Sequence, residues 1–185
     1  MDGRVAGTVR LELLALARRA VETYLREGRR LQRGRDFGAV ATEPRGAFVT
    51  LTERETGALR GCIGTILPAG PLDETVVRMA VAAAVEDPRF SPVRLEELPD
   101  LRVEISALTV PEPVTDLDAI EIGRHGLIVS RGYQKGLLLP QVAPEWGWDR
   151  VQFLEHTCLK AGLPKDAWKE PRTRIEWFEA EVWGE

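Results

Sequence analysis

The spacing of apolar residues predicts a helix at the start of the chain. From Val9 to about Arg33, apolar side chains recur at intervals that place them on one helical face. These side chains are Leu11, Leu14, Val21, Tyr24 and Leu25. The opposite face carries Arg19, Arg26, Arg30 and Arg33. A solvated helix face accounts for such a run of arginines, and contact with an acidic partner is the alternative.

The next segments combine strand and helix patterns. Residues 46–66, GAFVTLTERETGALRGCIGTI, predict a β-hairpin with its turn at ERETG. Residues 71–87, PLDETVVRMAVAAAVED, predict a helix with a proline near its start and an acidic first turn, ending before the next proline. Residues 101–110, LRVEISALTV, alternate strictly and predict a half-buried strand.

The second half of the chain repeats this mixture in a less regular order. Residues 119–140 predict two or three short strands joined by glycine turns, and residues 149–164 predict a helix closed by glycine and proline. Residues 174–184 predict a last strand whose apolar positions change phase, which indicates a bulge near Trp177–Phe178. This order of elements predicts an α+β fold, with a mixed or antiparallel sheet and flanking helices.

Composition narrows the class of protein. A chain of 185 residues with 44% apolar and 29% charged residues is typical of one globular domain. Its net charge of −4 argues against bulk electrostatic binding to nucleic acid or to an anionic membrane. No apolar run approaches the roughly 18 residues of a membrane span, and the first residues lack a secretory pattern. The two cysteines, Cys62 and Cys158, predict reduced thiols in a cytoplasmic protein.

The heptapeptide LRGCIGT, residues 59–65, holds the first candidate for chemistry. Strand alternation places Leu59, Gly61 and Ile63 toward the core and Arg60, Cys62 and Gly64 on the other face. A guanidinium beside Cys62 favours the thiolate, and the two glycines allow close backbone approaches. The alternative is that Cys62 is a small buried side chain among packing glycines. Spacing alone favours that alternative, because buried inert cysteines are common.

Two further polar positions stand out. His125 lies between glycines in a predicted turn before a strand, where a histidine either caps the turn, the favoured interpretation, or acts as a general base. A Cys62–His125 dyad is an open alternative, because the partners in such pairs are distant in sequence. In EDPRFSPV, Asp87 and Arg89 flank a proline, and Phe90 follows. Such a rigid polar loop either supports a site or ends a helix with a local ion pair.

No metal or cofactor is expected from the motifs. His156 and Cys158 are two residues apart on a predicted helix, so they point apart and do not chelate one ion. The chain has no CxxC, HxH or HExxH pattern, no Walker loop, no GxGxxG and no GxSxG. The five tryptophans are expected to serve core packing. They are Trp146, Trp148, Trp168, Trp177 and Trp183.

Four blocks of the chain together resemble the AMMECR family, which is named for the chromosomal region of the AMME syndrome. The blocks are LRGCIGT, EDPRFSPV with LRVEISALT, GRHGLIV, and GLLLPQVAPEWGWDRVQFLEHTCLKAGLP. They occur in order and at matching separations, and the resemblance extends from the first helix to the last strand. It implies one domain over residues 1–185 with a larger and a smaller lobe. Both chain ends would lie in the larger lobe and the cysteine motif near the cleft between the lobes.

The resemblance also implies site residues and partners. The positions carried over as candidates for catalysis are Cys62 and His125. Those carried over for substrate binding are Arg60, Gly61, Gly64, Asp87, Arg89 and Phe90. The motif positions also include Ile63, Pro140 and Val142. Gln141 stands where the eukaryotic branch has glutamate, so no catalytic carboxylate is expected there.

The resemblance brings no established reaction. Microbial relatives are encoded with a Memo-like protein and a radical SAM protein, which implies these two as partners. Two hypotheses follow. In the first, the chain is an enzyme or enzyme component that uses Cys62 as nucleophile or covalent carrier. Arg60 would stabilise the thiolate or bind an anionic group of the substrate, and His125 would transfer the proton. In the second, it is a non-catalytic adaptor or binding module.

Overall fold

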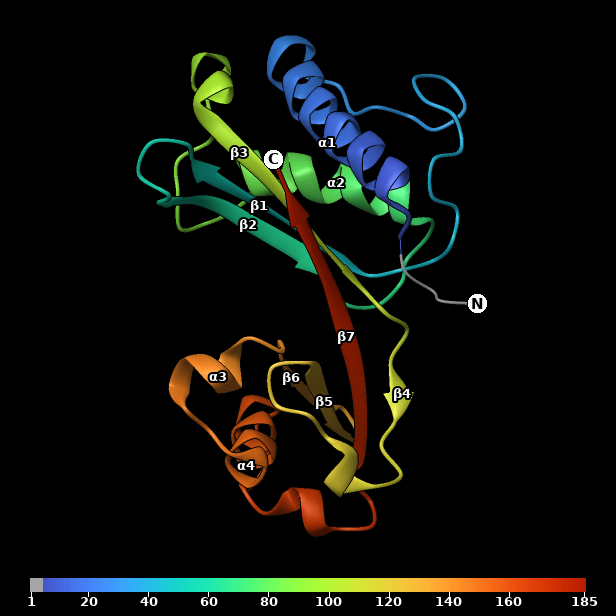
Figure 1. Ribbon diagram of the computed structural model, residues 1–185, viewed down its shortest axis with the longest axis vertical. Helices are drawn as coiled ribbons and strands as arrows, with labels where there is room; N and C mark the ends of the chain where they lie inside the picture. Colours follow the sequence, from blue (N-terminus) through green and yellow to red (C-terminus); the bar gives the residue numbers. More distant parts are fainter. Residues whose placement is uncertain (1–4) are drawn as a thin grey trace. The chain divides into compact units, whose positions relative to one another are not determined.

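The computed structural model describes residues 5–185, which divide into two compact units. The first unit comprises the described residues up to Leu108 together with Glu181–Glu185, and the second comprises Thr109–Ala180. Each unit combines helices with antiparallel strand pairs, so the α+β prediction is confirmed. The last strand, β7 (Arg174–Gly184), contributes to both units (Figure 1).

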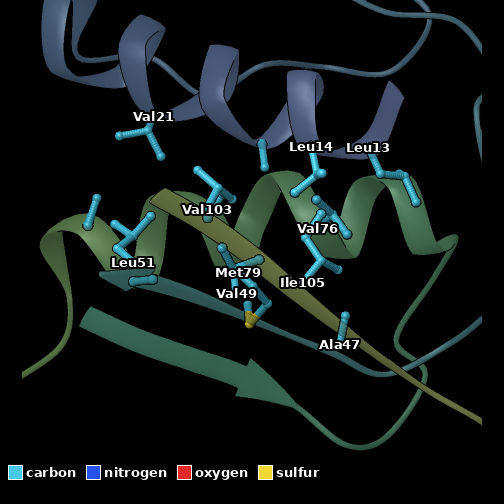
Figure 2. Packing of buried hydrophobic residues seen from close by; sticks show 14 of the residues in the cluster. Leu13, Leu14, Val21, Ala47, Val49, Leu51, Val76, Met79, Val103 and Ile105 are labelled. Carbon is cyan, nitrogen blue, oxygen red and sulfur yellow. The ribbon is translucent and has the colours of Figure 1, made fainter. Parts of the chain in front are cut away.

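In the first unit, two helices cover one face of a sheet with the order β2-β1-β3, and the end of β7 follows β3. Side chains of α2 lie between α1 and the strands (Figure 2). Val49 and Ile105 are fully buried there beside Val76 of α2, because alternate positions of β1 and β3 face the helices. The elements are α1 (Gly7–Glu27), β1 (Ala47–Glu53), β2 (Leu59–Thr65), α2 (Leu72–Val85) and β3 (Leu101–Leu108).

In the second unit, β7 pairs with β5 on one side and with the short β4 on the other, and β6 pairs with β5. A core of apolar side chains lies between this sheet and α4, with Phe153 and Leu127 fully buried in it. The elements are β4 (Glu112–Pro113), β5 (His125–Arg131), β6 (Gln134–Leu138), α3 (Val142–Trp146) and α4 (Arg150–Lys160). Short 3-10 helices occur at Leu95–Asp100, Leu117–Ala119 and Ala167–Lys169.

Most of the predicted elements are confirmed. The hairpin, the second helix, the alternating strand, the two strands of residues 119–140 and the later helix all form close to the expected positions. The hairpin turn needs a glycine, because Gly57 has φ +72°, a conformation that other residues rarely adopt.

The first helix differs from its prediction in length and in orientation. It ends at Glu27, because Gly28 adopts φ 68° and its N–H closes the helix on the carbonyl of Tyr24. Arg30 and Arg33 therefore lie beyond the helix, so the predicted arginine face is shorter than expected. The buried face of the helix also differs from the predicted one, since Leu11, which was expected on it, is 70% exposed. The buried residues of the helix are Leu13, Leu14, Leu16, Ala17, Ala20 and Val21.

The predicted bulge near Trp177–Phe178 is wrong. The register between β5 and β7 is unbroken from Arg174 to Glu179. The apolar phase changes because this strand is buried on both faces. Trp177 packs against the core of the second unit, whereas Phe178 lies against Gly126, where a Cβ would come within 2.3 Å of the phenyl ring.

Trp146 does not lie in the core. It is 70% exposed, so its predicted place there is wrong. It stacks on Trp148, which in turn stacks on His156.

As for membrane insertion, none of the helices formed by residues 5–185 combines the length and the apolar character that a bilayer crossing requires.

Candidate functional site

Cys62 lies in β2, which is the outer strand of the first unit's sheet. Gly61 faces α2 so closely that a Cβ would lie 2.1 Å from the carbonyl oxygen of Ala83, and Ile63 packs against the core on that side. Cys62 therefore points to the face opposite the helices. Its side chain is half-buried and its thiol is free.

The strand alternation predicted for LRGCIGT fails at its first residue. The pairing of β1 with β2 shifts between Leu51 and Thr52, which are opposite Gly61 and Leu59. Arg60 is the extra residue of this β-bulge. As a consequence Leu59 is 39% exposed, so its predicted core position is wrong.

Thr50 is the immediate neighbour of the Cys62 thiol. The two residues are opposite each other in the β1–β2 pair, so their side chains share one face. The Thr50 hydroxyl donates a hydrogen bond to Sγ of Cys62 at 3.3 Å. Sequence reasoning missed Thr50, because the bulge at Arg60 decides which residue of β1 lies opposite the cysteine.

Asp87 and Arg89 hold the backbone of Cys62 on the open edge of β2. The carboxylate of Asp87 accepts the N–H of Cys62 at 2.9 Å, and Nη2 of Arg89 donates to the Cys62 carbonyl at 3.3 Å. These bonds replace the strand partner that an edge residue lacks. Residues 25 and 27 positions away in sequence therefore fix the position of Cys62.

The Asp87–Arg89 pair is itself tightly bonded. Nε of Arg89 lies 2.9 Å from Oδ1 of Asp87, and Nη2 lies 2.7 Å from Oδ2. Asp87 is buried, and the guanidinium of Arg89 holds the pKa of that carboxyl well below its usual range. The Arg89 side chain remains 55% exposed and lies over the ring of Phe90, 5.4 Å from its centre. Of the two interpretations of this loop, the local ion pair is present and the same pair also contacts Cys62.

Arg60 is directed away from these groups. Its Nε lies 3.0 Å from Oε2 of Glu97, and its Nη1 donates to the carbonyl of Ser91 at 2.9 Å. Among residues 5–185, the hydrogen-bond and ion-pair partners of Arg60 do not include Cys62. Arg60 and Phe90 instead line an open hollow of about 470 Å³ on the first unit. A role for Arg60 in binding stays a prediction.

His125 belongs to the second unit, whereas Cys62 belongs to the first. It is the first residue of β5 instead of part of a turn, and it is buried. Its Nδ1 accepts the N–H of Glu121 at 3.0 Å, which caps the turn before the strand. Its ring lies on Trp177 with 4.5 Å between centres. Burial, and secondarily the charge of Arg124, lower the pKa of His125, so the neutral ring is favoured.

The structure thus brings four of the predicted residues together. Cys62, Asp87, Arg89 and Phe90 form one connected group, which we call the Cys62 site, and Thr50 belongs to it as well. Among residues 5–185, no group of three or more histidine, cysteine, aspartate or glutamate side chains is placed to hold a metal ion.

Comparison with known proteins agrees with the resemblance found in the sequence. The AMMECR1 family model matches residues 14–183. The chain belongs to the AMMECR1 family. A protein of Thermococcus gammatolerans is 50% identical over 181 residues, covering 94% of this chain and 88% of the relative. One of Pyrococcus furiosus is 49% identical over 181 residues, covering 94% and 86%.

A solved AMMECR1-like structure supports the fold as well. The crystal structure of an uncharacterised protein from Pyrococcus horikoshii matches with a TM-score of 0.84 and 44% identity, covering 98% of this chain and 93% of the other. The family and its fold are therefore shown. These relatives are described by organism, or as uncharacterised, so they bring no reaction to the Cys62 site.

Proposed function

We propose that this AMMECR1-family chain is an enzyme or enzyme component whose reactive group is the thiol of Cys62. The observation that carries the proposal is the hydroxyl of Thr50, which donates to Sγ at 3.3 Å. This hydrogen bond orients the thiol on the strand face that is opposite the helices. The thiol is half-buried, so a small molecule has access to it from the face opposite the helices.

The fixed backbone supports this proposal. Bonds from Asp87 and Arg89 hold both the N–H and the carbonyl of Cys62, so the thiol sits on a rigid part of an edge strand. Rigid placement of a nucleophile lowers the entropy that is lost when it meets its substrate. An inert packing cysteine needs no such support.

Arg89 defines the class of substrate in this proposal. Asp87 anchors its guanidinium, yet the side chain remains 55% exposed. An arginine held in this way binds carboxylate or phosphate groups, because its donors form a planar fork. The substrate is therefore a small anionic molecule with an electrophilic carbon near the anion.

The chemical step is nucleophilic attack by sulfur. Sγ of Cys62 donates its electron pair to the electrophilic carbon, an S–C bond forms, and the displaced pair leaves with the substrate's own leaving group. The thiol proton passes to water in this scheme. His125 keeps a role in proton transfer only as a prediction.

Alkylation with two reagents of different charge tests the proposal. Iodoacetate carries an anion and iodoacetamide does not, and both form an S–C bond with release of iodide. We expect the ratio of the alkylation rate with iodoacetate to that with iodoacetamide to be higher at Cys62 than for glutathione. Arg89→Gln should lower this ratio to the value for glutathione. Arg94→Gln, at a side chain that is 78% exposed, should leave the ratio unchanged. A ratio equal to that of glutathione in the wild type would refute the anionic substrate.

An adaptor is the second candidate function. The observation that favours it is that both carboxylate oxygens of Asp87 are occupied by Cys62 and Arg89, so the loop already serves to hold an edge strand. The partners proposed on this view are the Memo-like and radical SAM proteins. Complementation of a deletion strain by Cys62→Ser separates the two candidates. Full complementation contradicts the enzyme, and loss of function in a folded variant contradicts the pure adaptor.

A further inference from the structure

The second unit has a cavity of its own, with a volume of about 350 Å³. It opens beside the first residues of β5 and the middle of β7. The side chains that matter for its chemistry are Glu112, Glu121, Arg124, His125, Trp177 and Glu179. None of them belongs to the Cys62 site, and all of them lie between Thr109 and Ala180.

Strand register explains why these side chains converge. Glu112 of β4 is opposite Trp177 of β7, and His125 of β5 is opposite Glu179 of the same strand. Residues opposite each other project from the same face, and positions 177 and 179 share a face because the side-chain period is two. Four of the lining side chains therefore project from one face of the sheet.

The charges of the cavity are only partly paired. Arg124 contacts both Glu121 at 3.1 Å and Glu179 at 3.0 Å, so these three groups satisfy one another. The side chain of Glu112 has no ion pair or hydrogen bond to any residue in the described part of the chain. Its carboxylate is therefore available to a ligand of positive charge.

His125 provides a second unpaired group. Its side chain is only 8% exposed, and Nδ1 is occupied by the N–H of Glu121. Since Nδ1 accepts, the proton of the neutral ring is on Nε2. The carboxylate oxygen Oε1 of Glu179 lies 3.9 Å from Nε2, which is too far for a hydrogen bond. Because His125 lines the cavity, its Nε2–H is free to donate to an acceptor from a ligand or from water.

We propose that this cavity binds a small organic cation that also carries a hydrogen-bond acceptor. The cationic group, an ammonium or guanidinium, pairs with Glu112 beside the ring of Trp177, whose π-electrons attract positive charge. The acceptor oxygen takes the Nε2–H of His125. At about 30 Å³ for each non-hydrogen atom, the volume accommodates roughly a dozen such atoms. In this assignment His125 is a binding residue, and the proposal does not depend on the reactivity of Cys62.

The probe for this proposal is 4-guanidinobutanamide, which combines a guanidinium with an amide oxygen in a molecule of suitable size. Its neutral match is 4-ureidobutanamide. Ring nitrogen resonances of the two histidines report binding by NMR in the full-length protein. His156 serves as an internal reference, because it stacks on Trp148 with 3.8 Å between ring centres and does not line the cavity.

We expect millimolar 4-guanidinobutanamide to shift the His125 resonances in a saturable manner and to leave those of His156 unchanged. The ureido compound should bind roughly tenfold more weakly, as expected for the loss of one charge-assisted hydrogen bond. Glu112→Gln should weaken the binding of the guanidinium compound by a similar factor. Glu145→Gln changes an exposed carboxylate outside the cavity and should leave the binding unchanged. The proposal is overturned if His125 shifts no more than His156, or if Glu112→Gln binds as tightly as the wild type.

Discussion

Cys62 and Cys158 lie in different units of the chain, and their surroundings differ in exposure and in hydrogen bonding. Cys158 is fully buried in α4, in an apolar cluster with Val129 and Leu163. Burial raises the pKa of the Cys158 thiol. Cys62 is half-buried on an edge strand, and a hydroxyl donates to its sulfur.

This difference bears on the two alternatives that the sequence left open for a cysteine. The small inert side chain, which was the favoured alternative for Cys62 from spacing alone, describes Cys158. At Cys62 the neighbouring glycine allows close packing on one side of the strand, while polar groups fix the backbone and contact sulfur on the other.

Gly61→Ala should cause the largest loss of stability. A Cβ at this position would lie 2.1 Å from the backbone oxygen of Ala83, so β2 or α2 must shift. We expect a decrease of about 3 kcal/mol in the free energy of unfolding. Gly64→Ala is the matched control, because its Cβ meets the half-buried side chain of Phe48 instead of backbone, and we expect a loss of about 1 kcal/mol. Chemical denaturation measures both, and equal losses would contradict the packing role of Gly61.

Arg89→Met should have an intermediate effect. The substitution leaves the buried carboxylate of Asp87 without its ionic partner, which costs about 2 kcal/mol when the remaining bonds and partial exposure are considered. Arg94→Met removes an exposed ion pair with Glu97 and should cost less than about 1 kcal/mol. If urea denaturation shows that the two variants lose the same stability, Arg89 does not hold the edge of β2 as described.

The dependence of stability on pH should show the smallest effect. The pKa of Asp87 is lowered in the folded chain, because Arg89 and backbone donors favour its charged form. Its contribution to stability is therefore complete above the ordinary aspartate value of about 4 and is lost as pH falls below that value. Asp87→Asn should flatten the decline in stability between about pH 5 and pH 3, whereas Asp118→Asn, at a side chain that is 83% exposed, should not. Denaturation at several pH values provides the comparison, and identical curves for Asp87→Asn and the wild type would contradict the assigned cause.

The sequence allowed much of this picture to be predicted, and the exceptions have physical reasons. Alternation and helix signals located the hairpin, α2, β3 and α4, because in those segments local pattern and tertiary burial agree. The change of phase among the apolar residues of β7 was wrongly attributed to a bulge. It arises because both faces of this strand are buried.

The composition of the Cys62 site was predicted less completely than its location. Asp87 and Arg89 were recognised from a loop motif, but their bonds to Cys62 depend on the packing of a helix end against an edge strand. Thr50 was missed because a bulge sets its register. The unpaired state of Glu112 and of Nε2 of His125 depends on distances that no local pattern encodes.

We propose that Cys62 is a reactive thiol and that Cys158 is not. Incubation of the native protein with iodoacetamide at pH 7, followed by peptide mass spectrometry, measures the alkylation rate of each cysteine against glutathione in the same tube. We expect Cys62 to react several-fold faster than glutathione and Cys158 to react only after denaturation. A Cys62 rate at or below that of glutathione would contradict this proposal.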